Sequence, residues 1–518
     1  MTTNPIEYLE EPYGDFSALI AAHGEQRESQ IALDDGDEKL TWGQVDALTA
    51  RIAAQLQADG LQKGQAVAIL GTTTVHYALA YLAAIRAGGC AAPLTTSAAP
   101  QQLEAMMADS GAVHLFIDAA KLADMAGRTI APKHIIMLDG AQGDHPDYRC
   151  WMAAQGAAPA DPDCTADDPF NIIYSSGTTG TPKGIVHSRQ MRWRQYAGQP
   201  HFGVAGQATM LSTPLYSNTT LGLFLPTMAY GGTALLMKKF DVKGWLQRAA
   251  AARATHTMLV PVQYKRLMEY PQFDDYDLSA MQLKYCTSAP FSAELKAEVL
   301  ERMPGGLVEI YSMTEGGVVC LLLAHEHPDK LHTVGVPWGG SEVFTIDEEG
   351  RRLPDGEIGE LVGRSRTMMN GYQNQPEKTR DASWFDADGS RWQRMGDIGR
   401  VDADGFIELL GRSKDMIISG GFNIYPVDLE NVLMEHPDVA EAAVIGVESD
   451  RWGETPLGFV VAQKGAALDT DEVLAATNAK LGKTQRLSAL HVIEEMPRSH
   501  IGKLLKTELR EMALNKVT

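Results

Sequence analysis

Residues 174–184, Tyr-Ser-Ser-Gly-Thr-Thr-Gly-Thr-Pro-Lys-Gly, have the composition of a phosphate-binding loop. Glycines let backbone N–H groups turn towards an anion, and the hydroxyls and Lys183 add donors for phosphate oxygens. A P-loop would need Gly-x-x-x-x-Gly-Lys-Ser/Thr opening a helix, whereas here Pro182 precedes the lysine and Gly184 follows it. Apolar residues on both sides instead predict a strand, a nucleotide-binding loop and a strand. A flexible Gly/Ser/Thr connection is the alternative for this composition alone.

A second segment, Glu-Ile-Tyr-Ser-Met-Thr-Glu at 309–315, is followed by two glycines. It places an aromatic ring, a hydroxyl and a carboxylate at the end of a predicted strand, where open α/β sheets bind ligands. The segment therefore predicts a ligand-binding strand end. A solvated glutamate after a strand is the alternative.

Three further segments, 392–412, 417–426 and 496–503, carry polar residues near glycines. Residues 392–397 end in Gly-Asp397, and residues 405–412 end in Gly-Arg412. The segment 417–426 contains Gly-Gly, which lets the backbone approach a narrow ligand. Residues 496–503 end in Gly-Lys503. Taken singly, Asp397 would be an ordinary turn residue and Lys503 a solvated surface charge.

In this order the five segments closely resemble the signatures of the adenylate-forming superfamily: acyl- and aryl-CoA synthetases, peptide-synthetase adenylation domains and beetle luciferases. The resemblance covers essentially the whole chain. It implies that a carboxylic acid attacks the α-phosphorus of Mg-ATP to give acyl-AMP and pyrophosphate, after which a thiol displaces AMP. ATP, Mg²⁺ and coenzyme A are the implied cofactors.

The resemblance also implies the site residues. Lys503, Glu315 and Thr314 are the implied catalytic residues, Glu315 and Thr178 the metal ligands, and Lys414 the interdomain hinge. Tyr311 matches a residue that lies against adenine. The implied nucleotide- and CoA-binding residues are Ser175, Ser176, Gly177, Thr178, Thr179, Gly180, Lys183, Ser288, Ala289, Pro290, Tyr311, Ser312, Thr314, Asp397, Arg412, Gly420, Gly421 and Arg486.

The acid-binding pocket departs from the family pattern. The Pro-Leu-x-His motif appears as Pro-Leu-Tyr-Ser at 214–217, so Ser217 stands where histidine is usual and the gating role is in doubt. The predicted lining residues are Tyr216, Ser217, Asn218, Tyr264, Ser288, Ser312 and Gly317. Buried polar groups need partners, so this lining suits a hydroxycinnamate or benzoate more than an alkyl chain. A medium- or long-chain fatty acid is the alternative substrate. For the lining residues, the alternative is that several of them face solvent or each other.

The thiol is coenzyme A or a carrier-protein arm. Fifteen residues follow Lys503, too few for a fused carrier domain, so a separate carrier is the alternative. Arg486 resembles a CoA-contacting arginine and favours coenzyme A. A luciferase-type oxygenase shares the motifs, and a catalytically silent ATP-binding scaffold is the alternative from a different class.

The elements around these segments alternate between strand and helix, which predicts a layered α/β fold with a mostly parallel sheet. One helix is expected with apolar positions at Val45, Leu48, Ile52 and Leu56, a Thr41/Gln44 capping box at its start and Gly60 at its end. Others are expected at about 77–86, 101–109 and 242–252. Strands are expected at 66–70, 113–117, 257–261 and 283–286. We expect a large N-terminal domain over 1–413, with a small β-rich subdomain at 335–410, and a mobile C-terminal α+β lid over 414–518.

Composition limits the other partners. With 518 residues and a formal net charge of −21 at pH 7, the surface would repel nucleic acid and anionic membranes. The five cysteines are odd in number and far apart with no metal-type spacing, which disfavours a disulfide framework or a zinc site and fits a reducing cytoplasm. No signal peptide is expected, and a homodimer is possible.

Overall fold

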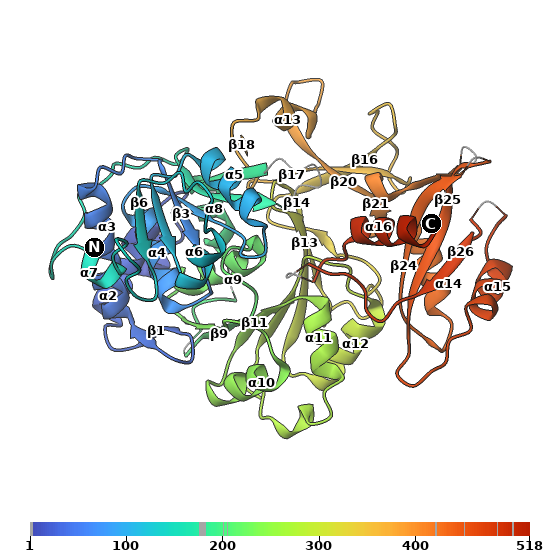
Figure 1. Ribbon diagram of the computed structural model, residues 1–518, viewed down its shortest axis with the longest axis horizontal. Helices are drawn as coiled ribbons and strands as arrows, with labels where there is room; N and C mark the ends of the chain where they lie inside the picture. The colour runs from blue at the N-terminus through green and yellow to red at the C-terminus, as the bar shows by residue number, and fades with distance from the viewer. Residues whose placement is uncertain are drawn as a thin grey trace. The chain divides into compact units, whose positions relative to one another are not determined.

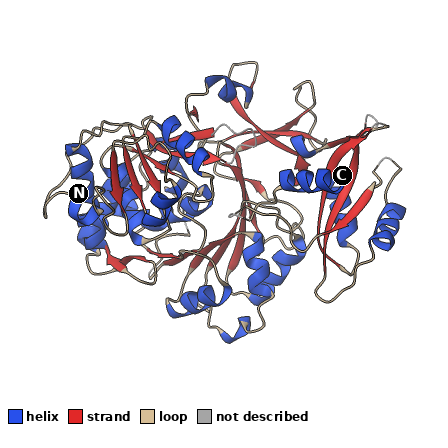
Figure 2. Cartoon of the chain, viewed as in Figure 1, coloured by secondary structure: helices blue, strands red, loops and turns tan. Residues whose placement is uncertain are grey.

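The computed structural model describes residues 4–175, 183–199, 201–204, 206–419, 422–449, 451–483, 485–499 and 502–517. The chain forms two compact units. The large unit comprises Met1–Leu331, Trp338–Ser341 and Arg364–Gln393, and the small unit comprises His332–Pro337, Glu342–Gly363 and Arg394–Thr518. Helices and strands alternate through most of the chain, as Figures 1 and 2 show.

One sheet of the large unit carries the predicted phosphate-loop strands. Its order is β18-β8-β7-β4-β3-β5-β6, and β4, β3, β5 and β6 are parallel to their neighbours. β8 is antiparallel to β7, and β18 to β8. The bounds are β18 Gly371–Tyr372, β8 Lys183–Ser188, β7 Pro169–Ser175, β4 Cys90–Pro93, β3 Ala66–Leu70, β5 His114–Ile117 and β6 His134–Met137.

A second sheet of the large unit has the order β14-β13-β12-β11-β9-β10-β1-β2. It is parallel from β13 to β1, and the outer strands β14 and β2 are antiparallel to their neighbours. The bounds are β14 Gly316–Leu323, β13 Gly306–Met313, β12 Leu283–Cys286, β11 His256–Leu259, β9 Ala208–Leu211, β10 Thr233–Leu236, β1 Ile31–Asp34 and β2 Lys39–Thr41. The short strand β19 (Ser383–Phe385) pairs with the start of β20.

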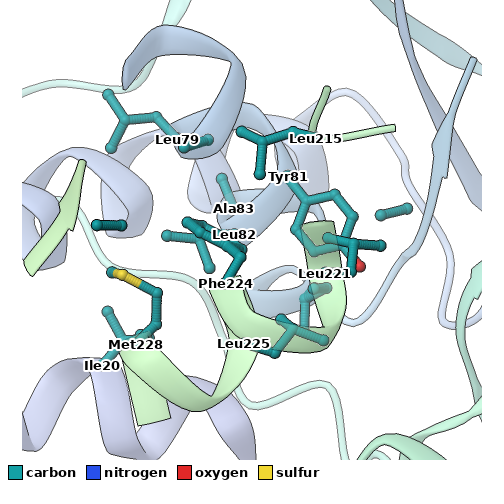
Figure 3. Close-up of a cluster of buried hydrophobic side chains, with 14 of the residues drawn as sticks. Ile20, Leu79, Tyr81, Leu82, Ala83, Leu215, Leu221, Phe224, Leu225 and Met228 are labelled. Atoms are coloured by element: carbon teal, nitrogen blue, oxygen red, sulfur yellow. The ribbon is translucent and has the colours of Figure 1, made fainter. Parts of the chain in front are cut away.

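Helices of the large unit pack on these sheets. They are α1 Pro5–Tyr8, α2 Phe16–Gln26, α3 Trp42–Ala58, α4 Val75–Arg86, α5 Pro100–Ser110, α6 Ala119–Asp124, α7 Tyr148–Trp151, α8 Arg189–Tyr196, α9 Asn218–Ala229, α10 Val242–Ala251, α11 Pro261–Met268, α12 Ala293–Arg302 and α13 Pro376–Asp381, with a 3-10 turn at Phe273–Asp275. Ten of the twelve residues of α4 are buried, so this helix is central rather than amphipathic. Leu82 and neighbouring α4 residues share one apolar cluster with Phe224 and Met228 of α9 (Figure 3).

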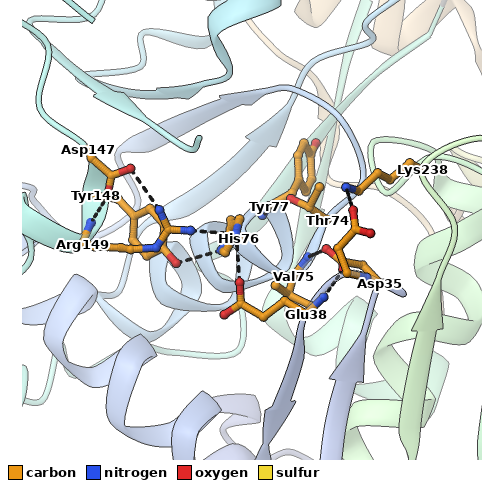
Figure 4. A network of polar contacts seen from close by, with 11 residues as sticks. Asp35, Glu38, Thr74, Val75, His76, Tyr77, Asp147, Tyr148, Arg149 and Lys238 are labelled. Carbon is orange, nitrogen blue, oxygen red and sulfur yellow. Dashed lines mark hydrogen bonds and ion pairs between the residues drawn. The ribbon is translucent and has the colours of Figure 1, made fainter. Parts of the chain in front are cut away.

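Polar contacts fix where α4 begins. The carboxylate of Asp35 accepts a hydrogen bond from the backbone N–H of Val75 at 3.1 Å (Figure 4). The next residue, His76, contacts the Tyr148 hydroxyl through Nδ1 at 2.8 Å and the Arg149 guanidinium through Nε2 at 2.9 Å. The start of α4 is therefore joined to the β1–β2 turn and to α7.

The small unit contains two sheets. One has the order β16-β17-β20, with β21 beside β20, and the other has the order β23-β22-β25-β24, with β26 beside β25. Val444 and Val460 pack with α14 and α15, while Ile445 and Phe459 pack with α16, so helices cover both faces of the β24–β25 pair. The bounds are β15 Val336–Pro337, β16 Glu342–Ile346, β17 Gly359–Arg364, β20 Arg391–Val401, β21 Ile407–Arg412, a 3-10 turn at Ser413–Asp415, β22 Ile417–Ser419, β23 Phe422–Ile424, α14 Pro426–Met434, β24 Val439–Ser449, β25 Gly453–Ala462, α15 Thr470–Lys480, β26 Ala489–Val492 and α16 Lys506–Val517.

The layered, mostly parallel α/β fold is confirmed. The Thr41/Gln44 capping box is present, and the strands predicted at 66–70 and 283–286 have those bounds. The strand predicted at 257–261 ends earlier, at Leu259, because Pro261 occupies the first turn of α11, where its missing N–H costs nothing.

The stretch 335–410 is strand-rich, as predicted, but its residues are divided between the two units, with 364–393 in the large one. The predicted domain boundary at 413/414 stays a prediction. Over the described ranges, no helix is long and apolar enough to cross a membrane.

Candidate active site

The predicted strand–loop–strand unit is present. β7 ends at Ser175, β8 begins at Lys183, and these two residues face each other in the antiparallel pair. The ends of the intervening segment therefore lie side by side. Residues 176–182 lie outside the described residues. They include the residues predicted to bind phosphate, which are Ser176, Gly177, Thr178, Thr179 and Gly180, and Thr178 is also a predicted metal ligand.

Thr314 and Glu315 form the tip of a hairpin. Met313 at the end of β13 pairs with Gly316 at the start of β14, which leaves two residues in the turn. Gly316 has φ +88°, and a Cβ there would lie 2.5 Å from the Thr367 carbonyl oxygen, so this position requires glycine. The tip lies at the carboxyl edge of the parallel strands, as the sequence predicts.

His187 of β8 joins the phosphate-loop strand to this hairpin. Its Nε2 lies 2.7 Å from the Thr314 carbonyl oxygen, and its Nδ1 lies 2.9 Å from a guanidinium nitrogen of Arg192. The guanidinium can only donate, so Nδ1 accepts and Nε2 carries the proton that it donates to Thr314. Burial and the Arg192 charge hold the pKa of His187 well below its usual value, so the ring is neutral.

Glu315 is held by two further contacts. Its carbonyl oxygen accepts from the Met369 N–H at 2.9 Å, and its Oε1 accepts from the Tyr372 hydroxyl at 2.9 Å. The pKa of Tyr372 is raised by burial and by the negative charge of Glu315, so the hydroxyl keeps its proton. Across the described residues, Oε2 of Glu315 has no hydrogen bond, which leaves a fixed carboxylate with one oxygen available to a cation.

A pocket of about 330 Å³ lies beside these residues in the large unit. It is lined by Lys183, Tyr372, Lys378, Asp381 and Ala382. The Lys183 ammonium lies 5.8 Å from the centre of the Tyr372 ring. Two lysines against one aspartate favour an anionic occupant at the point where the phosphate-loop segment returns to β8.

Of the predicted acid-binding residues, the structure brings Ser217, Asn218 and Ser288 together. Ser217 caps α9 by accepting from the Thr219 N–H at 3.2 Å, and the Thr219 hydroxyl lies 2.5 Å from that of Ser288. Ser288 has φ +82°. Within the part of the chain that the structure describes, the buried Oδ1 of Asn218 has no hydrogen-bond partner. A ligand donor would satisfy it.

The other predicted acid-binding residues are less clearly grouped. Tyr264 is fully buried, its hydroxyl donates to the Tyr285 carbonyl at 2.9 Å, and its ring stacks on Phe291, so a contact with the acid would require this packing to change. Tyr216 is half-buried, and Gly317 is buried with φ +81°.

The remaining predicted nucleotide-binding residues of the large unit lie at strand ends. Tyr311 and Ser312 are half-buried at the end of β13, and the Ser312 hydroxyl lies 3.4 Å from the Met313 carbonyl oxygen. Ala289 and Pro290 follow Ser288 after the end of β12.

In the small unit, Asp397 and Arg412 face each other on β20 and β21. Nε of Arg412 lies 2.7 Å from Oδ1 of Asp397. Lys503 as a whole residue is exposed, but burial of its ammonium group lowers its pKa. The charges of Arg412 and Lys414 lower this pKa further, while Asp397 and Asp415 raise it. The structure therefore brings Asp397, Arg412, Lys414 and Lys503 within electrostatic reach of one another.

A tight turn presents Lys503. The Gly502 N–H donates to the Ser499 carbonyl at 2.8 Å, with φ +76° at the glycine, and the Lys503 N–H donates to the Ser499 hydroxyl at 3.2 Å. Arg498 anchors the turn to β24 through Glu441 at 2.7 Å. Arg486 is exposed on a separate turn before β26, and Gly420 and Gly421 lie outside the described residues.

Sequence reasoning missed His187 and Tyr372, although both contact the predicted catalytic motif. Neither belongs to a recognisable spacing. Each acts through chain pairing over a long sequence separation, 127 residues for His187 with Thr314 and 57 for Tyr372 with Glu315.

Two family models match this chain. Residues 20–373 match the model of the AMP-binding enzyme family, and residues 428–503 match that of the AMP-binding enzyme C-terminal domain. A feruloyl-CoA synthase of Amycolatopsis sp is 32% identical over 92% of this chain and 95% of its own. The 4-coumarate–CoA ligase 5 of Oryza sativa subsp. japonica is 31% identical, over 93% and 92%.

Among solved structures, the amide bond synthetase McbA of Marinactinospora thermotolerans has a TM-score of 0.85 and 27% identity, covering 96% of this chain and 99% of its own. ATP-bound MatB of Rhodopseudomonas palustris has a TM-score of 0.82 and 30% identity, covering 96% and 98%. With matched models over most of its length, this chain belongs to the family of AMP-binding enzymes.

Proposed function

We propose that this protein is an ATP-dependent acid–thiol ligase that converts an aromatic carboxylic acid to its CoA thioester through an acyl-AMP. The observation that carries the proposal is the hydrogen-bonded junction between the phosphate-loop strand and the Thr314–Glu315 hairpin. It supports a site in which a triphosphate and a fixed carboxylate lie close together. In the first step a carboxylate oxygen of the acid attacks the α-phosphorus, and the bond to the pyrophosphate oxygen breaks.

The chain's residues position the reactants. Lys183 offers a positive charge beside the phosphate loop, and Thr314 donates towards the α-phosphate. Asp397 accepts from the ribose hydroxyls while its ion pair with Arg412 holds that carboxylate in place. Tyr311 supplies an aromatic face for adenine. Lys503 offsets the charge that develops as the acid carboxylate approaches the α-phosphate.

The residues present fit a magnesium ion. Glu315 offers one carboxylate oxygen held by Tyr372 and one without a partner among the described residues, which is the hard oxygen donor that Mg²⁺ prefers. We infer that Glu315 and Thr178 hold it. When bound, Mg²⁺ would neutralise charge on the phosphate oxygens.

In the second step a thiol sulfur attacks the acyl carbon, and AMP leaves with its phosphate oxygen. We infer that the small domain rotates about Lys414 between the two steps, so that Lys503 serves the first step and the loop with Gly420 and Gly421 serves the second. Arg486 would contact coenzyme A. The domain boundary at 413/414 belongs to this proposal.

An aromatic acid suits the acid pocket better than a fatty acid does. Among the described residues, the buried Oδ1 of Asn218 has no hydrogen-bond partner, so once it is opened to the acid a phenolic hydroxyl would satisfy it and an alkyl chain would not. Two relatives are named for feruloyl and 4-coumaroyl substrates, both phenolic acids. We therefore propose a hydroxycinnamate or hydroxybenzoate substrate.

The test is CoA-dependent AMP release with a panel of acids, alongside acid-dependent ATP–pyrophosphate exchange. Hydroxycinnamates and hydroxybenzoates should outperform octanoate and palmitate, and Asn218→Leu should reduce that preference. A preference for the fatty acids would overturn the substrate assignment, and no exchange with any acid would overturn the ligase. One solved relative is an amide bond synthetase, so the assay is repeated with amines in place of CoA. This comparison tests whether the acyl group is transferred to a thiol or to an amine.

All five cysteines are free, which fits the reducing cytoplasm that we propose for this protein. A homodimer stays a prediction, to be checked by light scattering.

A further inference from the structure

Three residues that can bind metals meet in the large unit, away from the candidate active site. Asp59 caps the C-terminus of α3, and His114 and His134 are the first residues of β5 and β6. These strands are parallel and place the two histidines opposite each other, so their rings stack with centres 4.5 Å apart. One potential ligand atom from each residue lies within 4.8 Å of the other two.

The cluster is not explained by hydrogen bonding. Oδ2 of Asp59 lies 3.6 Å from Nε2 of His114 and 3.7 Å from Nδ1 of His134, both beyond a normal hydrogen bond. His114 is fully buried, and neither of its ring nitrogens has a hydrogen-bond partner among the described residues. A buried imidazole with two unsatisfied nitrogens is costly, so this arrangement calls for a ligand.

We propose that Asp59, His114 and His134 bind one Zn²⁺ ion. Two imidazole nitrogens and a carboxylate oxygen are ligands that zinc favours, at bond lengths of about 2.0–2.2 Å. Tetrahedral ligands at those lengths lie about 3.3–3.6 Å apart, so the two distances to Asp59 are within about 0.4 Å of that range. The two histidine nitrogens, which lie within 4.8 Å of each other, must also come closer. The side chain of His134 is 39% exposed, and rotation of its ring would bring the lone pairs together.

Neighbouring residues orient the carboxylate as second-shell groups do in metal sites. The Trp151 indole N–H donates to Oδ2 of Asp59 at 3.0 Å, and the Gln55 amide donates to Oδ1 at 2.8 Å. Three protein ligands leave the fourth position of a tetrahedral ion open to water. The partial exposure of Asp59 and His134 gives the ion a route from solvent.

The location separates this ion from the ligase reaction. His114 and His134 stand where their strands begin, whereas the phosphate-loop segment follows the end of β7, which runs in the same direction as β4 in the same sheet. The proposed zinc site and the end of β7 therefore lie at opposite ends of the parallel strands. Zinc would join α3, β5 and β6 and stabilise the fold, without taking part in acyl transfer.

The experiment uses the full chain, free of any affinity tag and dialysed against a chelator. Titration calorimetry with ZnCl₂ should give one saturable site, and excess Zn²⁺ should raise the Tm by mass action. His134→Asn and Asp59→Asn should each weaken binding by about 100-fold or more. Trp151→Phe should weaken it by about 10-fold, as loss of a second-shell partner does.

Two controls identify the site. Cys150→Ser removes an exposed thiol at the end of α7 and should leave Zn²⁺ binding unchanged. ATP–pyrophosphate exchange should be the same in wild type, His134→Asn and Asp59→Asn, which also shows that the variants are folded. Absence of saturable binding, unchanged affinity in the two ligand variants, or loss of binding in Cys150→Ser would each overturn the proposal. Failure of the proposed ligase activity would leave the calorimetric result intact.

Discussion

Replacing Lys503 with alanine should separate the two half-reactions of the proposed ligase. The ammonium group shares its surroundings with Arg412 and Lys414, whose positive charges help to lower its pKa, and with the opposing charge of Asp397. Such a cluster of positive charges suits an anionic ligand. Alanine removes one charge from it and leaves the turn intact, because the Lys503 N–H and the Ser499 hydroxyl still make their hydrogen bond.

The expected loss follows from the strength of one charge at the site. At an effective dielectric constant of about 20, a unit charge 4 Å from a phosphate oxygen contributes about 4 kcal/mol. Removing one donor from an oxyanion site typically costs about 10²- to 10³-fold in kcat. Because Lys503 is open to solvent and Arg412 remains, we expect the loss in acyl-AMP formation to lie nearer 10²-fold.

The assay compares two reactions of the same variant. Acid-dependent ATP–pyrophosphate exchange measures adenylation, and CoA consumption from preformed acyl-AMP measures thioester formation. Lys503→Ala should lose the first and keep the second near the wild-type rate. Lys480→Ala is the matched control, because Lys480 forms an exposed ion pair with Glu435 in the same unit and should affect neither reaction.

Two results would refute the reasoning. Equal damage to both half-reactions would mean that Lys503 does not alternate between them, which contradicts the rotating small domain. Full activity in both would mean that Lys503 is an ordinary surface charge.

Three other outcomes are expected. Glu315→Gln should raise the Mg²⁺ concentration needed for ATP–pyrophosphate exchange without lowering the Tm, since it removes a charge at a hairpin tip; an unchanged Mg²⁺ requirement would contradict the assignment. Tyr372→Phe removes a hydrogen bond to that carboxylate worth about 1.5–3 kcal/mol, so kcat/KM for ATP should fall about 10- to 100-fold, with the ring still beside Lys183; a loss below threefold would show that Tyr372 does not position Glu315. Burial lowers the pKa of His23 to about 4. The unfolded chain therefore binds the extra proton first, and stability should fall by up to about 3 kcal/mol as pH drops from 6.5 to 4, a dependence that His23→Gln should reduce in urea unfolding at several pH values.

The parts of the fold that sequence predicted are those that neighbouring residues determine. The capping box at Thr41 and Gln44 is a contact over three residues, and both of its hydrogen bonds are present. The antiparallel strands around the phosphate-loop segment follow from apolar residues on either side of a run of glycines and hydroxyls. The sequence likewise placed Thr314 and Glu315 at a strand end, where they form the hairpin tip.

The parts that it missed depend on pairing between distant segments. Tyr372 reaches Glu315 because β18 pairs with β8, and β18 is only two residues long, too short for any periodic pattern. The absence of the usual histidine at Ser217 is visible in the sequence, but its local consequence is not: the serine caps α9. Asp59, His114 and His134 have no metal-type spacing, since the strand register alone brings them together.

One short strand connects the phosphate-binding segment with the metal-binding carboxylate of the proposed site. β8 carries Lys183 at its start and His187 four residues later, and residues an even number apart lie on the same face of a strand. Lys183 lines the pocket beside Tyr372, while His187 holds the Thr314 carbonyl and so the hairpin tip. The same strand pairs with β18, which delivers Tyr372 to Glu315. A shift of β8 by one residue would turn both side chains to the other face, so the register of this strand fixes the positions of Lys183 and of the Glu315 hairpin together.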